Sequence, residues 1–383
     1  SGMLKCRYRI QMSYQFKTYY QCGDKKFHNI FQAFREQKKT KHFPKFVIDQ
    51  ELLSALANIT KPKTLYAKYI RGLMISRLKY LRKKYNKLKI AYSGGTDSYT
   101  IMRLCVDNDI YIDETITQMS SIRNNLRTNL EYYTGLQLAK KYEGTLIGKC
   151  TELHPTDADL EFVNDPEWFY NEKLITGPSI PFRVYSVPNM IEQAIGSEEN
   201  TIVLMGYEKP SFLVEDGKLY WTQIDSSVGE MMGQQNTIPF FLDKENPELV
   251  AALAFAVLEK IDVNQALSKN QLIDFHFTNH KKQIELLDHC GLYKTPHHFI
   301  NVGLLGKTVF NFNRKSQRFF NELQNNSKQE YINKIYDTHK RISDLYSDLS
   351  YGLEFDGNLV KSVGRYSQKL EIDQSKFGLV IKD

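Results

Sequence analysis

The chain has 383 residues, of which 42% are hydrophobic, and this is enough apolar material for two domains or for one large domain with appendages. Its formal net charge of +7 favours polyphosphate ligands and permits nucleic acid as a partner. Five scattered cysteines without a CxxC pair argue against a disulfide framework or a zinc ribbon and for a cytoplasmic location.

The first 62 residues predict a small α+β region. Apolar and polar residues alternate over 4–12, which indicates a half-buried strand. A second extended stretch over 16–21 ends at Cys22-Gly23-Asp24, a sequence typical of a hairpin turn, and residues 27–38 indicate a short helix. We expect this region to end before Lys61-Pro62.

A strongly basic helix is expected over 64–85. Apolar residues recur along it at helical spacing, and the opposite face carries seven cations: Lys68, Arg71, Arg77, Lys79, Arg82, Lys83 and Lys84. We expect this face to be solvated and to flank a phosphate site. A nucleic-acid surface is the alternative.

From residue 88 the pattern alternates between strand and helix. Strands are expected over 88–92, 110–119, 145–150 and 201–207, with helices over 98–106, 124–142 and 187–195 between them. Strands separated by helical crossovers form a parallel sheet with helices on both faces. The fold class is therefore α/β, with the parallel sheet sandwiched by helices.

The rest of the chain predicts a hairpin and further helices. Apolar segments over 212–214 and 219–221 flank Asp216-Gly217, a strong hairpin signal, and a helix over 246–260 has Pro247 at its start. Residues 270–350 are expected to be mainly helical, and the tail beyond 352 irregular or extended. Three regions result: a small α+β region (1–62), a nucleotide domain (63–260) and a mainly helical C-terminal region (261–383).

A short motif after the first parallel strand carries the chemistry: Tyr92-Ser93-Gly94-Gly95-Thr96-Asp97-Ser98. Ligands of open α/β sheets bind at the carboxyl ends of strands, where this motif turns into a helix. Adjacent glycines let backbone amides approach an anion, the hydroxyls add donors, and the helix N-terminus adds positive potential. Asp97 suits a Mg²⁺ ligand rather than a phosphate ligand.

A Gly-Gly turn capped by Ser and Asp is the alternative interpretation of this motif. It explains the two glycines and one cap. It does not explain three hydroxyls and a carboxylate within six positions, so we favour a phosphate-binding loop.

The motif matches the SGGxDS signature, and residues 88–207 resemble the PP-loop (N-type) ATP pyrophosphatase superfamily. The resemblance implies the HUP-like, adenine nucleotide alpha hydrolase fold. It also implies ATP and Mg²⁺ as cofactors, cleavage of ATP between the α- and β-phosphates, transfer of AMP to an acceptor and release of pyrophosphate. A Walker A loop, by contrast, holds the β- and γ-phosphates with a lysine.

The resemblance also assigns residues outside the motif. The end of the second strand, at Gln118 and Met119, would line the adenine pocket. In the asparagine-synthetase branch the loop after the fourth strand has a Gly-Glu-Gly-x-Asp-Glu pattern, which only Gly206 and Glu208 echo. This departure weakens the argument for the same substrate. Lys209 in the same loop would neutralise charge at the α-phosphate.

A second basic loop is expected from the C-terminal region. Residues 301–308 end like a Walker A loop, but Asn301 stands where the first glycine should be. We therefore expect Lys307 to reach the pyrophosphate as the late lysine of such synthetases, with Arg314 and Lys315 as further candidates. His276 and His280 have a metal-binding spacing, but ordinary histidines are favoured there.

The order of parts is closest to the synthetase domain of asparagine synthetase. Met3 is followed directly by Leu4 and not by a cysteine nucleophile, so we expect no glutaminase activity, and ammonia, another amine or a partner would supply nitrogen. A sulfur-transfer enzyme would need a reactive cysteine near the site, and Cys150 is the one candidate, for which a buried, inert thiol is the favoured interpretation.

The leading functional hypothesis is therefore an AMP-forming ligase that adenylates a small carboxylate or amide acceptor for attack by ammonia or an amine. The second is an enzyme that modifies bases of tRNA or DNA. The third is a non-catalytic nucleotide-binding protein. No apolar run reaches the 18 residues of a membrane span, so no membrane partner is expected.

Overall fold

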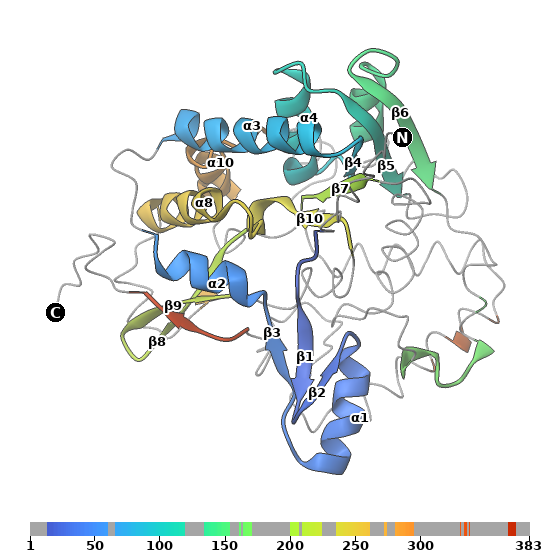
Figure 1. The fold of residues 1–383 in the computed structure, drawn as a ribbon, viewed down its shortest axis with the longest axis vertical. Helices are drawn as coiled ribbons and strands as arrows, with labels where there is room; N and C mark the ends of the chain where they lie inside the picture. Colours follow the sequence, from blue (N-terminus) through green and yellow to red (C-terminus); the bar gives the residue numbers. More distant parts are fainter. Residues whose placement is uncertain are drawn as a thin grey trace, which may run out of the picture.

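The computed structural model describes residues 14–59, 66–118, 134–153, 161, 164–170, 200–206, 209–223, 235–260, 272–273, 280–294, 330, 333–334, 337 and 367–372. These residues form three sheets with helices around them, and Figure 1 shows their arrangement. Within these residues, no helix is long and apolar enough to cross a lipid bilayer.

A small N-terminal unit consists of β1 (Tyr19–Cys22), β2 (Lys25–Phe27), α1 (Ile30–Thr40) and β3 (Lys45–Val47). Its antiparallel sheet has the order β2-β1-β3, and the expected turn at Gly23 joins β1 to β2 with a positive φ of 59°. The Asn29 side chain caps α1 by accepting a hydrogen bond from Phe31 N at 2.8 Å. Figure 1 shows this unit at one end of the long axis, away from α3 and α4. The strand expected over 4–12 lies outside the described residues.

The central sheet contains five strands: β4 (Lys87–Ala91), β5 (Ile112–Gln118), β6 (Ile147–Leu153), β7 (Thr201–Met205) and β10 (Thr237–Pro239). Their order is β10-β7-β4-β5-β6, and every neighbouring pair is parallel. The predicted α/β fold with a parallel sheet is confirmed. The chain builds the sheet outward from β4 in both directions, so the strand order reverses between β4 and β7.

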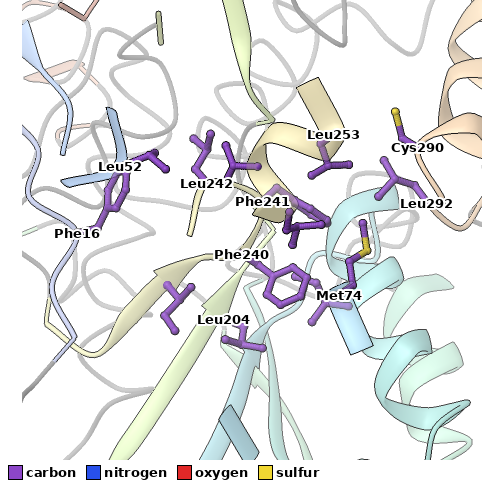
Figure 2. Close-up of a cluster of buried hydrophobic side chains, with 14 of the residues drawn as sticks. Phe16, Leu52, Met74, Leu204, Phe240, Phe241, Leu242, Leu253, Cys290 and Leu292 are labelled. Atoms are coloured by element: carbon purple, nitrogen blue, oxygen red, sulfur yellow. The ribbon is translucent and has the colours of Figure 1, made fainter. Parts of the chain in front are cut away.

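The helices α3 (Ala67–Lys84) and α4 (Thr96–Val106) contact β4 and each other. Helix α8 (Pro247–Lys260) packs on α3, on α2 (Gln50–Ala57) and on α10 (His280–His289). It is buried on all sides from Leu249 to Leu258, because its sequence is apolar all round. Figure 2 shows this core, with Phe240 of the 3₁₀ helix η4 (Phe240–Leu242) beside Met74 of α3 and Leu204 of β7.

A third, antiparallel sheet has the order β11-β8-β9-β12. The predicted hairpin forms its centre as β8 (Ser211–Glu215) and β9 (Lys218–Thr222), and Asp216 and Gly217 have positive φ of 51° and 73°, as a tight turn of this hand requires. The edges are β11 (Leu272–Ile273), within a region expected to be mainly helical, and β12 (Leu370–Glu371), within the expected extended tail. This sheet therefore contains residues from both sides of position 260, where we expected the nucleotide domain to end.

A side-chain clamp ties the end of this sheet to the N-terminal region. The Gln368 side chain accepts a hydrogen bond from Ile48 N at 2.9 Å and donates one to Ile48 O at 2.7 Å. The two bonds reproduce the pairing that a neighbouring strand would make. Residues 320 positions apart are thus joined.

The basic face of α3 is not simply solvated, which corrects the expectation from its sequence. Arg77 is buried, with Nε 2.6 Å from Asp243 Oδ2 and Nη2 2.9 Å from Glu245 Oε2. Arg82 pairs with Asp113, Lys84 pairs with Glu245, and Arg71 donates to the carbonyl of Gly291. These cations join α3 to its neighbours.

Two glycines with open space around them should respond oppositely to alanine. A Cβ on Gly217 or on Gly72, in the middle of α3, meets nothing within 4 Å. Gly217 has positive φ, so Gly217→Ala should lower the free energy of unfolding by about 1 kcal/mol. Gly72→Ala should raise it by about 0.5–1 kcal/mol, because alanine favours a helix. Urea denaturation of both variants measures the two changes in the free energy of unfolding. Changes of the same sign would contradict the turn assigned to Gly217.

Candidate functional site

The loop between β4 and α4 has the backbone of an anion-binding turn. Gly94 adopts a φ of 74°, which side-chain-bearing residues rarely adopt. Gly95 is the N-cap residue of α4, and within the described part of the chain no side chain makes a capping hydrogen bond there. The amides in the first turn of a helix have no acceptor within the helix. An anion can accept hydrogen bonds from them, and the helix dipole favours negative charge at this end.

The two serines of the loop bond to the loop itself. Ser98 Oγ accepts from Ser93 N at 3.2 Å and donates to Gly95 O at 3.3 Å. Ser93 Oγ accepts from Gly95 N at 3.3 Å and lies 3.2 Å from Ser98 Oγ. Hydroxyls that we expected to contact phosphate therefore fix the shape of the turn in this structure. Thr96 is half-buried, and its carbonyl accepts a hydrogen bond from the Thr100 hydroxyl at 2.7 Å.

Two glycines from distant parts of the chain pack against this loop. A Cβ on Gly206, just after β7, would lie 2.7 Å from Ser98 N and 2.9 Å from the Asp97 carbonyl carbon. A Cβ on Gly135, in the helical residues 134–140, would lie 2.4 Å from Gly94 Cα. Gly206, which we expected over the phosphates, thus packs against the backbone of the loop. Gly135 was missed, although an isolated glycine within a helical pattern is a signal of close packing.

Asp97 and Lys209 form an ion pair at the edge of this site. Lys209 Nζ donates to Asp97 Oδ1 at 2.6 Å, and the side chains are 1% and 23% exposed respectively. The ammonium also lies 5.5 Å from the centre of the Phe241 ring. Lys209 was expected to face the α-phosphate, whereas this structure places it on the carboxylate of the loop.

The sheet topology brings these groups together. β4 and β7 are parallel neighbours with Ala91 opposite Met205, so residues that follow them reach the same edge of the sheet. This edge is where the strand order reverses, and such a reversal leaves a crevice between the loops of an open α/β sheet. The loop over 92–98 and the segment containing Gly206 and Lys209 meet at that position.

The other predicted residues have mixed locations. The Tyr92 side chain lies in the core, its hydroxyl has no hydrogen-bond partner among the described residues, and burial raises its pKa. Gln118 is the last residue of β5, the strand beside β4. Further predicted residues lie outside the described part of the chain: Met119, Glu208, His276, Lys307, Arg314 and Lys315.

The described residues contain no group of three or more His, Cys, Asp or Glu side chains that could hold a metal ion. Mg²⁺ does not require such a group, because it is commonly held by one or two carboxylates together with substrate phosphates. Asp97 fits that requirement, since one oxygen is bound by Lys209 and the side chain remains partly exposed. The residues present therefore fit a magnesium–polyphosphate complex.

The described cysteines are suited to packing and not to sulfur chemistry. Cys22, Cys105, Cys150 and Cys290 are free and buried. Burial raises the pKa of the Cys150 thiol and raises that of Cys290 to about 12. A raised thiol pKa lowers the fraction of reactive thiolate. Cys150 is therefore a poor carrier of persulfide.

This burial predicts slow thiol labelling. In a Cys6→Ser variant, which keeps the four buried thiols, an aromatic disulfide reagent at pH 8 should label less than one thiol in the native protein and four in urea. At that pH a thiol with the pKa of Cys290 is a thiolate in about one molecule in ten thousand. Absorbance of the released thiolate measures the reaction, and rapid labelling of the native variant would contradict the packing.

Neither a scan against protein-family models nor a search of curated proteins found a match.

Proposed function

We propose that this chain binds ATP with Mg²⁺ at residues 92–98 and adenylates the carbonyl of an acceptor. In this proposal it is an ATP-dependent, asparagine-synthetase-like C–N ligase of the PP-loop type, with the HUP-like fold and no glutaminase domain. The observation that carries the proposal is the meeting of the 92–98 loop with Gly206 and Lys209 where the strand order reverses.

The reaction would have two steps. An acceptor carboxylate oxygen attacks the α-phosphorus of ATP, the bond between the α- and β-phosphates breaks, and pyrophosphate leaves. Ammonia or an amine then attacks the activated carbonyl, and AMP leaves. The tight turn over Gly94 and Gly95 and the uncapped N-terminus of α4 support binding of the pyrophosphate group.

Asp97 would hold Mg²⁺, which supplies positive charge to the leaving pyrophosphate when it is bound. Lys209 would act through Asp97, because its ammonium fixes one carboxylate oxygen and leaves the other for the ion. In the same proposal Gln118 and Met119 line the adenine pocket, Glu208 and Gly206 lie over the phosphates, and Lys307 reaches the pyrophosphate from the C-terminal region.

The proposal is tested with ATP labelled at the α- or γ-phosphate, incubated with panels of carboxylic acids, amides and amines. Formation of labelled AMP and pyrophosphate with a small acceptor supports it. Release of inorganic phosphate without AMP would overturn it. ATP binding without turnover across the panels would indicate a nucleotide-binding protein, and a requirement for tRNA or DNA would indicate a base-modifying enzyme.

The ion pair gives a more specific prediction. Lys209→Met should weaken binding of Mn²⁺, used as a spectroscopic substitute for Mg²⁺, to the ATP complex by about ten-fold, because residues that orient a metal ligand have effects of this size. Lys218→Met removes a lysine from an exposed pair with Glu371 and should leave Mn²⁺ binding unchanged. Electron paramagnetic resonance measures free Mn²⁺, and equal affinity in the Lys209 variant would remove its assigned role.

A further inference from the structure

The surface of the N-terminal unit combines positive charge with an exposed aromatic ring. Residues 24–26 and 38–45 form this surface, called here the basic N-terminal surface. It carries six exposed lysines: Lys25, Lys26, Lys38, Lys39, Lys41 and Lys45. Phe43 is 64% exposed, more than any other large hydrophobic residue of the described part of the chain.

The two segments lie side by side. The Cys22 thiol, at the end of β1, donates to the carbonyl of His42 at 3.1 Å. Lys25 Nζ and Lys39 Nζ, one from each segment, lie 2.7 and 3.9 Å from Glu36 carboxylate oxygens. Lys25 and Lys39 therefore lie on the α1 side of the small sheet, whereas Lys26 and Lys45, both opposite Gln21 of β1, lie together on its other face.

Two carboxylates share the basic N-terminal surface with the six lysines, those of Asp24 and Glu36. Glu36 is engaged by Lys25 and Lys39, and its hydrogen bond from Lys25 is the main cause of its lowered pKa. Positive charge therefore remains in excess on this surface. Lys38, Lys39 and the C-cap residue Lys41 also suit the negative end of the α1 dipole, but Lys26 and Lys45 lie in strands β2 and β3 and have no such explanation.

Local sequence keeps the Phe43 ring out of the core. The unit has its own aromatic core, in which the Tyr20 and Phe46 rings lie 5.6 Å apart and Phe31 and Phe34 are buried. Pro44 restricts the residue before it to extended conformations, and the helix ends just upstream at Lys41 with a positive φ. Leaving a phenylalanine ring in water forgoes about 1.5–3 kcal/mol of burial, which makes this exposure notable.

We propose that the basic N-terminal surface binds single-stranded nucleic acid, with its lysines on the phosphates and Phe43 stacked on an unpaired base. An aromatic ring beside a positively charged surface is the combination that non-specific single-strand binding uses. A duplex keeps its base faces inside the stack, so the ring favours a single strand. A membrane anchor would need a broad apolar face, and Phe43 is a single ring among lysines.

This inference changes where a nucleic acid would be held. The sequence offered the basic helix α3 as an alternative nucleic-acid surface, but four of its seven cations have partners within the protein. The inference rests on the surface alone and not on the proposed adenylation.

The test uses fluorescence anisotropy with fluorescein-labelled single strands of RNA and DNA, about 20 nucleotides long, which exceeds the site size of typical single-strand binding modules. The full chain is titrated without ATP at several salt concentrations. Phe43→Ala should weaken binding by roughly 5- to 100-fold and leave the salt dependence unchanged. Lys41→Gln with Lys45→Gln should reduce the slope of log Kd against log salt by about 1.4, for two lost phosphate contacts.

Matched variants elsewhere provide the controls. Lys79→Gln with Lys83→Gln removes the same charge from exposed positions of α3, and Tyr66→Ala removes a ring that is 48% exposed. Both should bind as the wild type does. Three outcomes would each overturn the inference. They are an equal loss of affinity in these controls, no binding of nucleic acid by the wild type, and Phe43-dependent binding to phosphatidylserine vesicles in place of nucleic acid. AMP formation with small acceptors is measured without nucleic acid, so the two proposals can fail separately.

Discussion

Replacing Gly135 by alanine is expected to weaken the proposed binding of ATP by about 100-fold or more while the sheet stays folded. The added Cβ would lie 2.4 Å from Gly94 Cα and 3.1 Å from Gly94 N. Both are backbone atoms, so no flexible side chain can move aside. Either the helical residues 134–140 or the loop must shift, and misplacement of a binding group by about 1 Å already has effects of this size.

Calorimetric titration with ATP and Mg²⁺ measures this loss, and circular dichroism checks the fold. Gly72→Ala is the matched control, because Gly72 is also helical and has open space for a Cβ. Gly206→Ala approaches the loop from the other side, at 2.7 Å from Ser98 N, and should show a similar loss. Wild-type affinity in both loop variants would mean that the shape of this turn does not determine nucleotide binding.

Removing the carboxylate of Asp243 is expected to lower the free energy of unfolding by about 3–5 kcal/mol, because the Arg77 guanidinium would stay buried without its partner. Asp243 also accepts from the Tyr14 hydroxyl at 3.1 Å, and its burial raises its pKa despite the nearby guanidinium. This one carboxylate thus joins α3, Tyr14 upstream of β1 and the segment that leads into α8.

Urea denaturation of Asp243→Ala measures the loss. The double variant Arg77→Met with Asp243→Leu replaces both charges by apolar groups and should recover much of the stability, because no charge is then left unpaired. Glu371→Gln removes the partner of the exposed Lys218 and should leave stability unchanged. A loss below about 1 kcal/mol in Asp243→Ala would show that Arg77 finds solvent or another partner.

Local patterns predicted the elements that local chemistry determines. Neighbouring residues specify the strand, the glycine turn and the helix over 87–106. An apolar run is followed by Gly94 and Gly95, and then by residues that favour the first turn of a helix. The hairpin at Asp216-Gly217 is specified in the same way. Both were found at their expected positions.

Contacts between distant residues could not be predicted from these patterns. Lys209 lies 112 positions from Asp97, and Arg77 lies 166 positions from Asp243. Helical spacing placed Arg77 on the basic face of its helix. Periodicity contains no information about a carboxylate on another segment, so the ion pair that buries Arg77 could not be predicted. The strands β11 and β12 are two residues each, too short for alternation to show. The loop over 92–98 is therefore predictable, but its packing and ion pair are not.

The clamp between Gln368 and Ile48 has a consequence for how the protein is made. During synthesis Ile48 leaves the ribosome long before Gln368, so its backbone groups lack these two hydrogen bonds until residue 368 has been translated. The edge strand β12 arrives equally late to cover β9. Native structure in this part of the molecule must therefore be completed after translation has passed residue 371, which leaves an unfinished intermediate for chaperones to protect.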